Sequence, residues 1–513
     1  MENLDNNLDI NKTSYIKRLF ILYTLFFKLG ILNFGGGYAM LPLLTREIAL
    51  KRGWANENEL RDYYAVGQCT PGAIAVNVST FIGYKIAGIL GGVIATLGFI
   101  TPAFVIIFVI ASFLTNFSDN PYVINALKGI NVVVFVLILS AIKSLVKSSI
   151  VDKTTLLITI VVALCSIFIS SNIIPLYVYV IISLLFGILI NVIRENKTNV
   201  KAKNSEIKEE VKPKEKKKIV INKNNVISYI IGFLVGAIFG LLSLFSLIFI
   251  KNKKYKNGIF STIFVETIML ICTLVLILTG NNVFFKLYFN FFRIGLCAFG
   301  GGLATFPFLK ELGEVTGWFS NADLTSMLAI SESTPGAMGV NMSTYVGYTV
   351  SIGEYNNYPL SFLGSIISTL GLVTPSIIVI IVISLFLDKF KTNKYVEYAF
   401  YGLRASSVGL IIAACFSVLE VSIFNDCCID VESTIYGIFN NVRFFSVIEE
   451  LKLETNLNFF QMIYKYFDYL INWKCLAFGG IMAILVFKFK KHPVFYIILG
   501  IIFGILLNMA SAL

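Results

Sequence analysis

Two positive charges lie inside apolar stretches of the chain, and each precedes a cluster of three glycines. Lys28 stands six residues before Phe34, which opens one FGGG sequence, and Arg293 stands six residues before Phe299, which opens another. A cation in a membrane core costs about 2.5–3.5 kcal/mol on insertion scales and usually marks function. Free backbone N–H groups at a broken helix attract anions. The pattern favours an anion site, but two alternatives stay open: long side chains that reach the membrane surface, and glycines that only let helices pack closely.

The glycine clusters belong to motifs that occur twice. FGGGYAMLPLL at 34–44 and FGGGLATFPFL at 299–309 share seven of eleven residues. TPGAIAVNVSTFIGY at 70–84 and TPGAMGVNMSTYVGY at 334–348 share ten of fifteen. Glycine and proline are poor helix formers, and transporter sites form where membrane helices are interrupted. The motifs therefore predict broken helices around a substrate site.

The predicted substrate-binding residues form one set in each half of the chain. The first set is Lys28, Gly35, Gly36, Gly37, Pro42, Gln68, Thr70, Pro71, Gly72 and Asn77. The second set is Arg293, Gly300, Gly301, Gly302, Pro307, Glu332, Thr334, Pro335, Gly336 and Asn341. Further helix breaks are expected at Thr101-Pro102 and Thr374-Pro375. The two asparagines either donate hydrogen bonds to an oxyanion or join neighbouring helices.

Charge differs between the copies at two positions. Glu332 replaces Gln68, and Arg404 stands where the first half has Asn131. A carboxylate beside a broken helix either carries a proton during transport or pairs with a nearby arginine. The acids that follow the glycine motifs, Glu47 and Glu311, are expected in loops and paired with neighbouring bases.

Enzyme and metal chemistry find little support in the residues. The chain has no P-loop, no HExxH and no GxSxG sequence. Its eight cysteines form no CxxC pair, and its one histidine is His492. We therefore expect no catalytic residues, no bound metal and no cofactor.

The elements that must hold these residues are membrane helices. Of 513 residues, 57% are hydrophobic and only 14% are charged, against about 25% charged in soluble proteins. Several apolar runs exceed the length of about 20 residues that a membrane helix needs, and they do not alternate as strands of a barrel do. The sequence predicts an all-α polytopic membrane protein. Its net charge of +12 lies mostly in loops and a linker, so it does not indicate nucleic-acid binding.

Four regions follow from the repeats and the composition. They are a first repeat at 15–195, a basic linker at 196–225, a connecting transmembrane region at 226–282, and a second repeat at 283–513 with an insertion near 425–472. The linker is rich in lysine and glutamate, and its polar composition predicts disorder from Lys197 onward. Lysines fall after different segments in the two halves, so we expect inverted repeats with about 13 transmembrane segments.

The paired motifs resemble those of the chromate ion transporter family, in its two-domain form. The resemblance covers both halves, but alanine stands at Ala73 and Ala337 where proline is common in the family. It implies export of chromate, a tetrahedral oxyanion, through the two sets of residues named above. The alternatives are a transporter or channel for another anion such as sulfate, and a membrane assembly protein without transport.

Expected partners are the oxyanion, the lipid bilayer and a second copy of the chain. The location is the cell membrane, with the N-terminus and the linker cytoplasmic.

Overall fold

The computed structural model describes most of both repeats. The described residues are 13–33, 37–117, 120–169, 171, 173–206, 283–385, 387, 390, 393–423, 471–489, 491 and 493–509. The chain divides into two compact units, one made of residues 1–191 and 286–513 and the other of residues 192–285. Of the second unit, the structure describes the C-terminal part of α7 and the first residues of α10.

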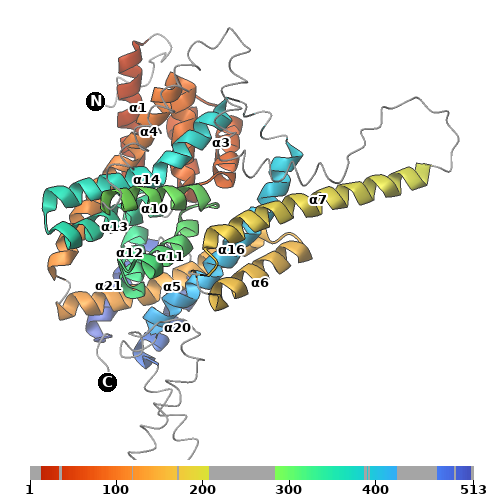
Figure 1. Ribbon diagram of the computed structural model, residues 1–513. Helices are drawn as coiled ribbons and strands as arrows, with labels where there is room; N and C mark the ends of the chain where they lie inside the picture. The colour runs from red at the N-terminus through yellow and green to blue at the C-terminus, as the bar shows by residue number, and fades with distance from the viewer. Residues whose placement is uncertain are drawn as a thin grey trace, which may run out of the picture. The chain divides into compact units, whose positions relative to one another are not determined.

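All regular elements within the described ranges are helices (Figure 1). The first half contains α1 (Tyr15–Leu32), α2 (Gly37–Leu44), the π-helix η2 (Thr45–Leu50), α3 (Glu57–Cys69), α4 (Ile74–Phe117), α5 (Pro121–Ser149), α6 (Lys153–Phe168) and α7 (Leu176–Glu206). The second half contains α10 (Val283–Cys297), the 3-10 helix η3 (Gly302–Thr305), α11 (Phe306–Thr316), α12 (Asn321–Ser333), α13 (Met338–Tyr355), α14 (Tyr358–Ser384), α16 (Lys394–Ile423), α20 (Trp473–Phe489) and α21 (Pro493–Leu506).

Five of the described helices are long and apolar enough to cross a membrane. They lie at Ile74–Leu114, Pro121–Ser149, Leu176–Glu195, Tyr358–Ser384 and Lys394–Ile423. Two shorter apolar helices, α6 and α21, accompany them. The chain is therefore an all-helical, multi-pass membrane protein, as its composition predicts.

Corresponding short helices begin with the same capping arrangement. The side chain of Asn56 caps α3 in a capping box with Glu59, and Ser320 caps α12 in a capping box with Asp323. Each pair occupies two of the orphan N–H groups at a helix start. The boundaries of α3 and α12 are thus encoded locally, immediately upstream of the TPG motifs.

The helix breaks at both TPG motifs and at the second glycine cluster are confirmed by the structure. Between α3 and α4 the chain is non-helical at the first TPG, and between α12 and α13 it is non-helical at the second. The second glycine cluster separates α10 from η3, and the first lies between α1 and α2. Half-helices therefore end and begin at these motifs in both repeats.

The predicted breaks at Thr101-Pro102 and Thr374-Pro375 are wrong. Pro102 lies inside α4 and Pro375 inside α14. In both helices the threonine hydroxyl before the proline donates to a carbonyl four residues back, at 2.6 Å. Threonine hydroxyls can satisfy carbonyls near a proline in a membrane helix, and the helix continues.

Helix α4 is a hairpin of two antiparallel segments. The backbone leaves the helical conformation at Ala87 and Gly88, where Gly88 has φ 66°. The hydroxyls of Thr80 and Thr96 approach to 2.6 Å across the hairpin. One long apolar stretch thus contributes two segments.

The second half builds the same hairpin from α13 and α14. The turn is at Asn356, whose φ is 45°. The hydroxyls of Thr344 and Thr369 lie 2.8 Å apart across it. The two hairpins therefore share their central polar contact, although the contact threonines are 16 residues apart in the first and 25 in the second.

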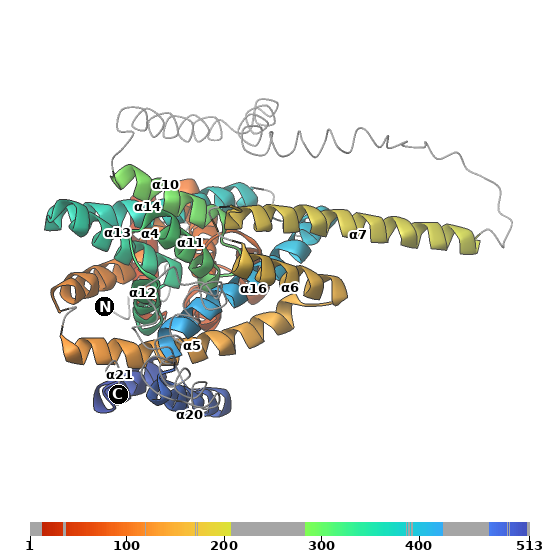
Figure 2. The same cartoon turned by 60° about the horizontal axis from the view of Figure 1, so that its bottom comes forward.

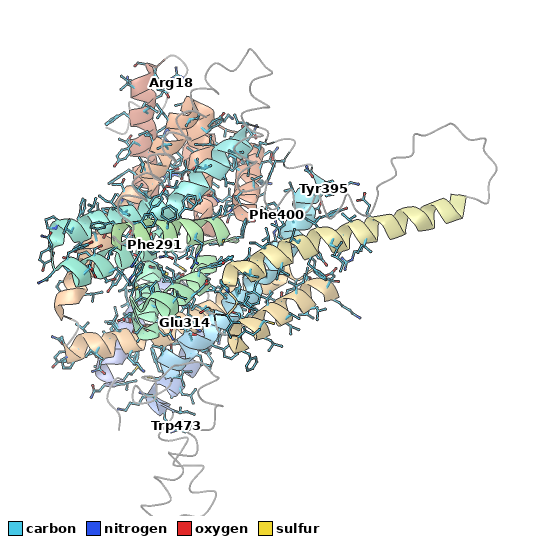
Figure 3. All side chains as sticks on the ribbon, in the orientation of Figure 1. Arg18, Phe291, Glu314, Tyr395, Phe400 and Trp473 are labelled. Carbon is cyan, nitrogen blue, oxygen red and sulfur yellow. The ribbon has the colours of Figure 1, made fainter. Side chains whose placement is uncertain are left out.

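The first helix of each half packs on its hairpin through glycine. Gly30 and Gly98 face the carbonyls of Phe99 and Tyr23, where a Cβ atom would collide with the backbone. In the second half, Gly295 faces the carbonyl of Leu372 in the same way. Phe291, labelled on α10 in Figure 3, is completely buried beside this contact.

The remaining helices cross between the halves. Helix α5 of the first half packs against α20 and α21 of the second, and α16 of the second half packs against α6 of the first (Figures 1 and 2). Gly129 on α5 meets the backbone of Gly500 and Gly504 on α21, while Gly402 on α16 meets that of Ser183 and Gly187 on α7. Because each half supplies one helix to the other, the two repeats form one interlocked body.

A one-residue difference between the repeats is absorbed by η2. Phe34 and Phe299 are 265 residues apart, whereas Trp54 and Trp318 are 264 apart. The extra residue of the first half falls within Thr45–Leu50, where the backbone forms a π-helix. Single inserted residues in helices commonly produce this π geometry.

The structure tests only part of what the sequence predicts for the linker, the connecting region and the insertion. Helix α7 continues to Glu206, so the expectation of disorder is wrong for residues 197–206. The remainder of the linker, residues 226–282 and residues 425–470 of the insertion lie outside the described residues. So do Gly35 and Gly36 of the predicted site.

Candidate functional site

Each TPG loop meets the residue that precedes the glycine cluster of the other half. The N–H of Gly72 donates to the carbonyl of Ala298 at 2.8 Å, and the N–H of Gly336 donates to the carbonyl of Asn33 at 2.9 Å. Ala298 and Asn33 are the residues directly before the two FGGG sequences. A loop from one half thus satisfies the C-terminal end of a broken helix from the other half, where carbonyls lack intrahelical partners. The broken helices are brought together in two reciprocal pairs.

Glycine is required in both TPG loops. Gly72 has φ +91° and Gly336 has φ +114°, a region that residues with a Cβ atom rarely adopt. A Cβ atom on Gly72 would collide with Ser376, and one on Gly336 would collide with Ala103. These neighbours lie directly after the two Thr-Pro pairs. The Thr-Pro helices therefore support the loops instead of breaking beside them.

The described glycine segment runs alongside the first TPG loop. Pro71 and Phe299 form an isolated antiparallel bridge. Gly300 and Gly301 have φ +101° and +104°, and Gly301 faces the side chain of Ile74 at the start of α4. Gly300 is exposed, and no atom lies within 4 Å of where its Cβ would be. A ligand can consequently reach the backbone at Gly300, because no side chain covers it.

The two asparagines hold the loops in shape. The amide nitrogen of Asn77 donates to the carbonyls of Gly67 and Pro71 and to the hydroxyl of Thr70, at 3.0–3.2 Å. That of Asn341 makes the equivalent bonds in the second half at 3.0–3.3 Å. Both residues are completely buried. Their donors are thus engaged by the protein, which favours a positioning role over direct contact with an oxyanion.

The two predicted cations lie in different environments. Lys28 is exposed on α1, so the structure does not place it in a buried site. Arg293 is half-buried on α10, with its guanidinium 5.6 Å from the ring centre of Tyr177. It also acts electrostatically on the carboxylate of Glu311, which is buried in α11. Arg293 therefore has an aromatic and an acidic neighbour within the protein.

A third cation contacts a TPG motif directly. The Nη2 atom of Arg404, on α16 of the second half, lies 2.6 Å from the Sγ atom of Cys69, the residue before the first TPG. The sequence showed Arg404 as a charge without a counterpart, but its proximity to Cys69 joins residues 335 positions apart. Neither residue was among the predicted site residues.

The other predicted residues are distributed around the breaks. Pro42 is exposed inside α2, whereas Pro307 is buried in the first turn of α11. Gln68 and Glu332 are half-buried at the ends of α3 and α12. Thr70, Pro71, Thr334 and Pro335 are buried in the loops, and Gly37 and Gly302 begin the helical turns that follow the glycine clusters.

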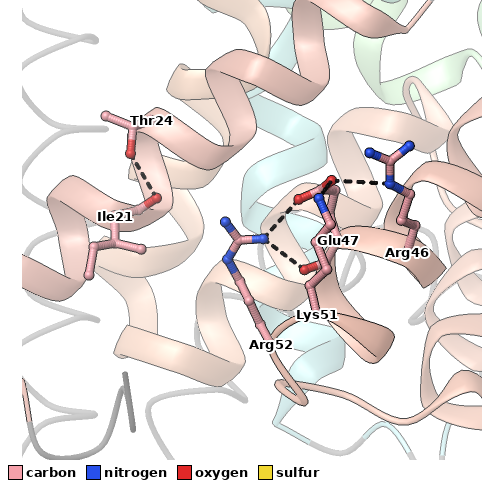
Figure 4. Close-up of polar contacts among 6 residues, drawn as sticks. All are labelled: Ile21, Thr24, Arg46, Glu47, Lys51 and Arg52. Carbon is pink, nitrogen blue, oxygen red and sulfur yellow. Dashed lines mark hydrogen bonds and ion pairs between the residues drawn. The ribbon is translucent and has the colours of Figure 1, made fainter. Parts of the chain in front are cut away.

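An ion cluster follows the first glycine motif (Figure 4). The carboxylate of Glu47 accepts from Lys51 at 2.8 Å and Arg52 at 2.9 Å, and lies 3.6 Å from Arg46. The predicted pairing of Glu47 with neighbouring bases is confirmed, but its position in a loop is wrong, because it lies in η2. Glu311 likewise lies in a helix, α11.

The fold and these motifs can be compared with known proteins. A family profile described as "Chromate transporter" matches residues 20–189 and 285–505, which is most of both repeats. The chain belongs to the chromate transporter family. This is a family of membrane transporters, in line with the apolar helices of the structure.

Two of the relatives match about three quarters of the chain. An uncharacterised transporter of Methanocaldococcus jannaschii is 25% identical over 398 residues, covering 76% of this chain and 82% of the relative. A chromate transport protein of Pseudomonas aeruginosa is 22% identical over 402 residues, covering 78% and 81%. A chromate transport protein of Cupriavidus metallidurans is 31% identical over 136 residues, covering 26% and 34%. No solved structure matches the chain significantly.

Metal ligation has no cluster to support it in the described part of the chain. No group of three or more His, Cys, Asp or Glu side chains there is arranged to hold a metal ion.

Proposed function

We propose that this protein is a secondary transporter that exports chromate across the cell membrane. The observation that carries the proposal is the reciprocal bonding of each TPG loop to the residue that precedes the glycine cluster of the other half. The pairing gathers broken helices at buried positions, as in the substrate sites of secondary transporters. Two relatives named chromate transport proteins support chromate as the substrate.

The proposed substrate contacts are mainly backbone groups. The half-helices that begin at Ile74 and Met338 direct the positive ends of their dipoles toward the loops, which favours an anion. Exposed Gly300 lets the anion approach the backbone. The remaining residues of the two predicted sets line or position this path, with Asn77 and Asn341 in the positioning role.

The membrane potential is sufficient to drive the proposed export. Chromate carries two negative charges at neutral pH. Moving two charges out of a cytoplasm that is negative by about 100 mV releases about 4–5 kcal/mol. The transporter then needs no ATP, and coupling to protons is optional.

The proposed topology has two inverted repeats, at 15–195 and 283–513, with about 13 transmembrane segments. Its support is that equivalent contacts occur twice, with the roles of the halves exchanged. An N-terminus and a linker at 196–225 in the cytoplasm complete this proposal. A homodimer stays a prediction.

Transport in proteoliposomes tests the proposed function. Vesicles containing the purified protein are loaded with radiolabelled chromate, and efflux is measured with and without an imposed potential. We expect efflux above that of protein-free vesicles, faster when the interior is negative. Sulfate and molybdate serve as competitors.

The alternatives predict different results. Efflux of sulfate but not chromate would support a transporter for another anion. Efflux no faster than from protein-free vesicles, for all three anions, would contradict transport and leave the assembly role.

A further inference from the structure

Arg404 is a cation within an apolar helix. It lies on α16, at Lys394–Ile423, one of the five candidate membrane spans. Its neighbours Leu403 and Ala405 are 2% and 0% exposed, whereas Arg404 is exposed. Among the residues that the structure describes, no carboxylate lies within ion-pair distance of its guanidinium. A cation in this position without a partner is costly unless a ligand supplies the negative charge.

Asp152, an acid that α16 contacts, already accepts hydrogen bonds from other residues. Asp152 accepts hydrogen bonds from the hydroxyl of Tyr401 at 2.6 and 2.7 Å and caps the start of α6 through Thr155. Arg404, one turn along α16 from Tyr401, contacts Cys69 instead. A neutral thiol does not balance a guanidinium charge.

The repeats differ at this position, although the surrounding contacts are duplicated. The counterpart of Arg404 is Asn131, which is 4% exposed on α5, and the counterpart of Cys69 is Ser333. The cation is therefore present beside the first TPG loop, and the equivalent residue of the first half is neutral. A guanidinium offers several N–H donors in a plane, which suits the oxygens of a tetrahedral oxyanion.

We propose that Arg404 binds the transported oxyanion at the Cys69 end of the first TPG loop. Of the two equivalent TPG loops, the first is then the one with a cationic site for the anion. The inference rests on the proposed function and adds to it the residue that selects a negatively charged substrate. The loop comes from one half and the cation from the other, so the site requires both repeats.

Thiol labelling tests the site without a transport measurement. A full-length variant retains Cys69 as its only cysteine, with the other seven replaced by serine. In proteoliposomes, its reaction rate is measured with anionic sulfonatoethyl methanethiosulfonate and with cationic trimethylammonioethyl methanethiosulfonate. Because Arg404 adjoins the thiol, we expect the anionic reagent to react about tenfold faster than the cationic one. Molybdate, which does not oxidise thiols, is expected to slow the reaction.

Two substitutions assign the effect to the charge of Arg404. In Arg404→Gln, we expect the two rates to become similar and protection by molybdate to disappear. Arg404→Lys keeps the charge and is expected to retain both effects in part, which separates loss of charge from loss of fold. The matched control carries Ser333→Cys as its only cysteine, next to Glu332, where the counterpart of Arg404 is the neutral Asn131. It is expected to lack both the preference for the anionic reagent and the protection by molybdate.

The outcomes distinguish this inference from the proposed function. Wild-type chromate flux without charge preference or protection at Cys69 would overturn the inference and leave the transporter proposal standing. Protection that persists in Arg404→Gln would also overturn it. Protection that requires Arg404, in a protein that shows no flux, would support the anion site while the transport proposal fails.

Discussion

At the scale of single residues, one amide in each half shapes the broken helix. Asn77 and Asn341 donate to carbonyls near the ends of α3 and α12 that have no partner within the helix. Gly72 and Gly336 supply the backbone conformation that lets the following helix begin at once. The loops are thus held by amide hydrogen bonds, and a positive charge reaches the first loop from Arg404 of the other half.

Glu47 provides a prediction about pH. Burial raises the pKa of its carboxyl, but hydrogen bonds from Lys51 and Arg52 and their charges outweigh burial, so the pKa lies below its ordinary value of 4.5. A carboxyl whose pKa is lowered by folding stabilises the protein above its unfolded pKa, and this contribution is lost as pH falls through the folded pKa. We expect Glu47→Gln to cost about 1–2 kcal/mol at pH 7.

The melting temperature of the detergent-solubilised protein checks this expectation. The difference between wild type and Glu47→Gln should be largest at pH 7 and should shrink as pH falls through the lowered pKa of the wild-type carboxyl. A difference of equal size at pH 7 and pH 3 would show that the ion cluster does not stabilise the fold.

At the scale of elements, the helices approach one another through glycine and hydroxyl residues. The same kinds of contact recur in the two hairpins, in the packing of α1 on α4, and in the crossing of α5 and α16 into the opposite half. Lipid tails are as apolar as leucine, so close packing and hydrogen bonds must hold membrane helices together. The glycines of these helices are therefore packing residues, in contrast to Gly300, which is open.

The crossing contacts give a prediction about packing. Gly402→Ala and Gly129→Ala place a Cβ atom against the backbone of a helix from the other half, where it cannot be accommodated without movement. Overpacking of this kind costs about 1–3 kcal/mol. We expect both variants to lower the melting temperature in detergent.

Gly353→Ala is the matched control, because Gly353 is also helical but has no atom within 4 Å of its Cβ position. Alanine has the higher helix propensity, so this variant should be neutral or slightly stabilising. Equal melting temperatures for all three variants would contradict the crossed packing of the halves.

At the scale of the whole molecule, each half contributes contacts on which the loops and helices of the other half depend. Each half supplies a loop, a supporting Thr-Pro helix and a crossing helix to its counterpart. The arrangement is asymmetric in charge at the first TPG loop, because Arg404 contacts Cys69 there and its counterpart in the first half, Asn131, is neutral. An oxyanion that moves between the loops would therefore meet one strong site on its path.

The inverted topology predicts opposite exposure of the two hairpin turns. Leu90 lies two residues after Gly88, and Tyr358 lies two residues after Asn356, and both side chains are exposed. With Leu90→Cys and Tyr358→Cys in a cysteine-free background, a membrane-impermeant thiol reagent should label one variant in intact cells and the other only after permeabilisation. Labelling of both variants from the same side would rule out inversion.

Much of the architecture can be predicted from the sequence because it is encoded locally. Composition fixes membrane helices, capping boxes fix the starts of α3 and α12, and the backbone preferences of glycine fix the breaks at the TPG motifs. Local preference fails at Pro102 and Pro375, which lie inside α4 and α14. The hydroxyls of the preceding threonines donate to the carbonyls of Leu97 and Leu370, and the helices continue.

The sequence by itself determined the duplicated motifs, the helical membrane class and the residue types suited to an anion. Tertiary structure alone decided which copies meet: the first TPG with the second glycine segment, and Cys69 with Arg404. Such contacts join residues hundreds of positions apart, and they depend on how helices from both halves pack, which neither periodicity nor local propensity encodes.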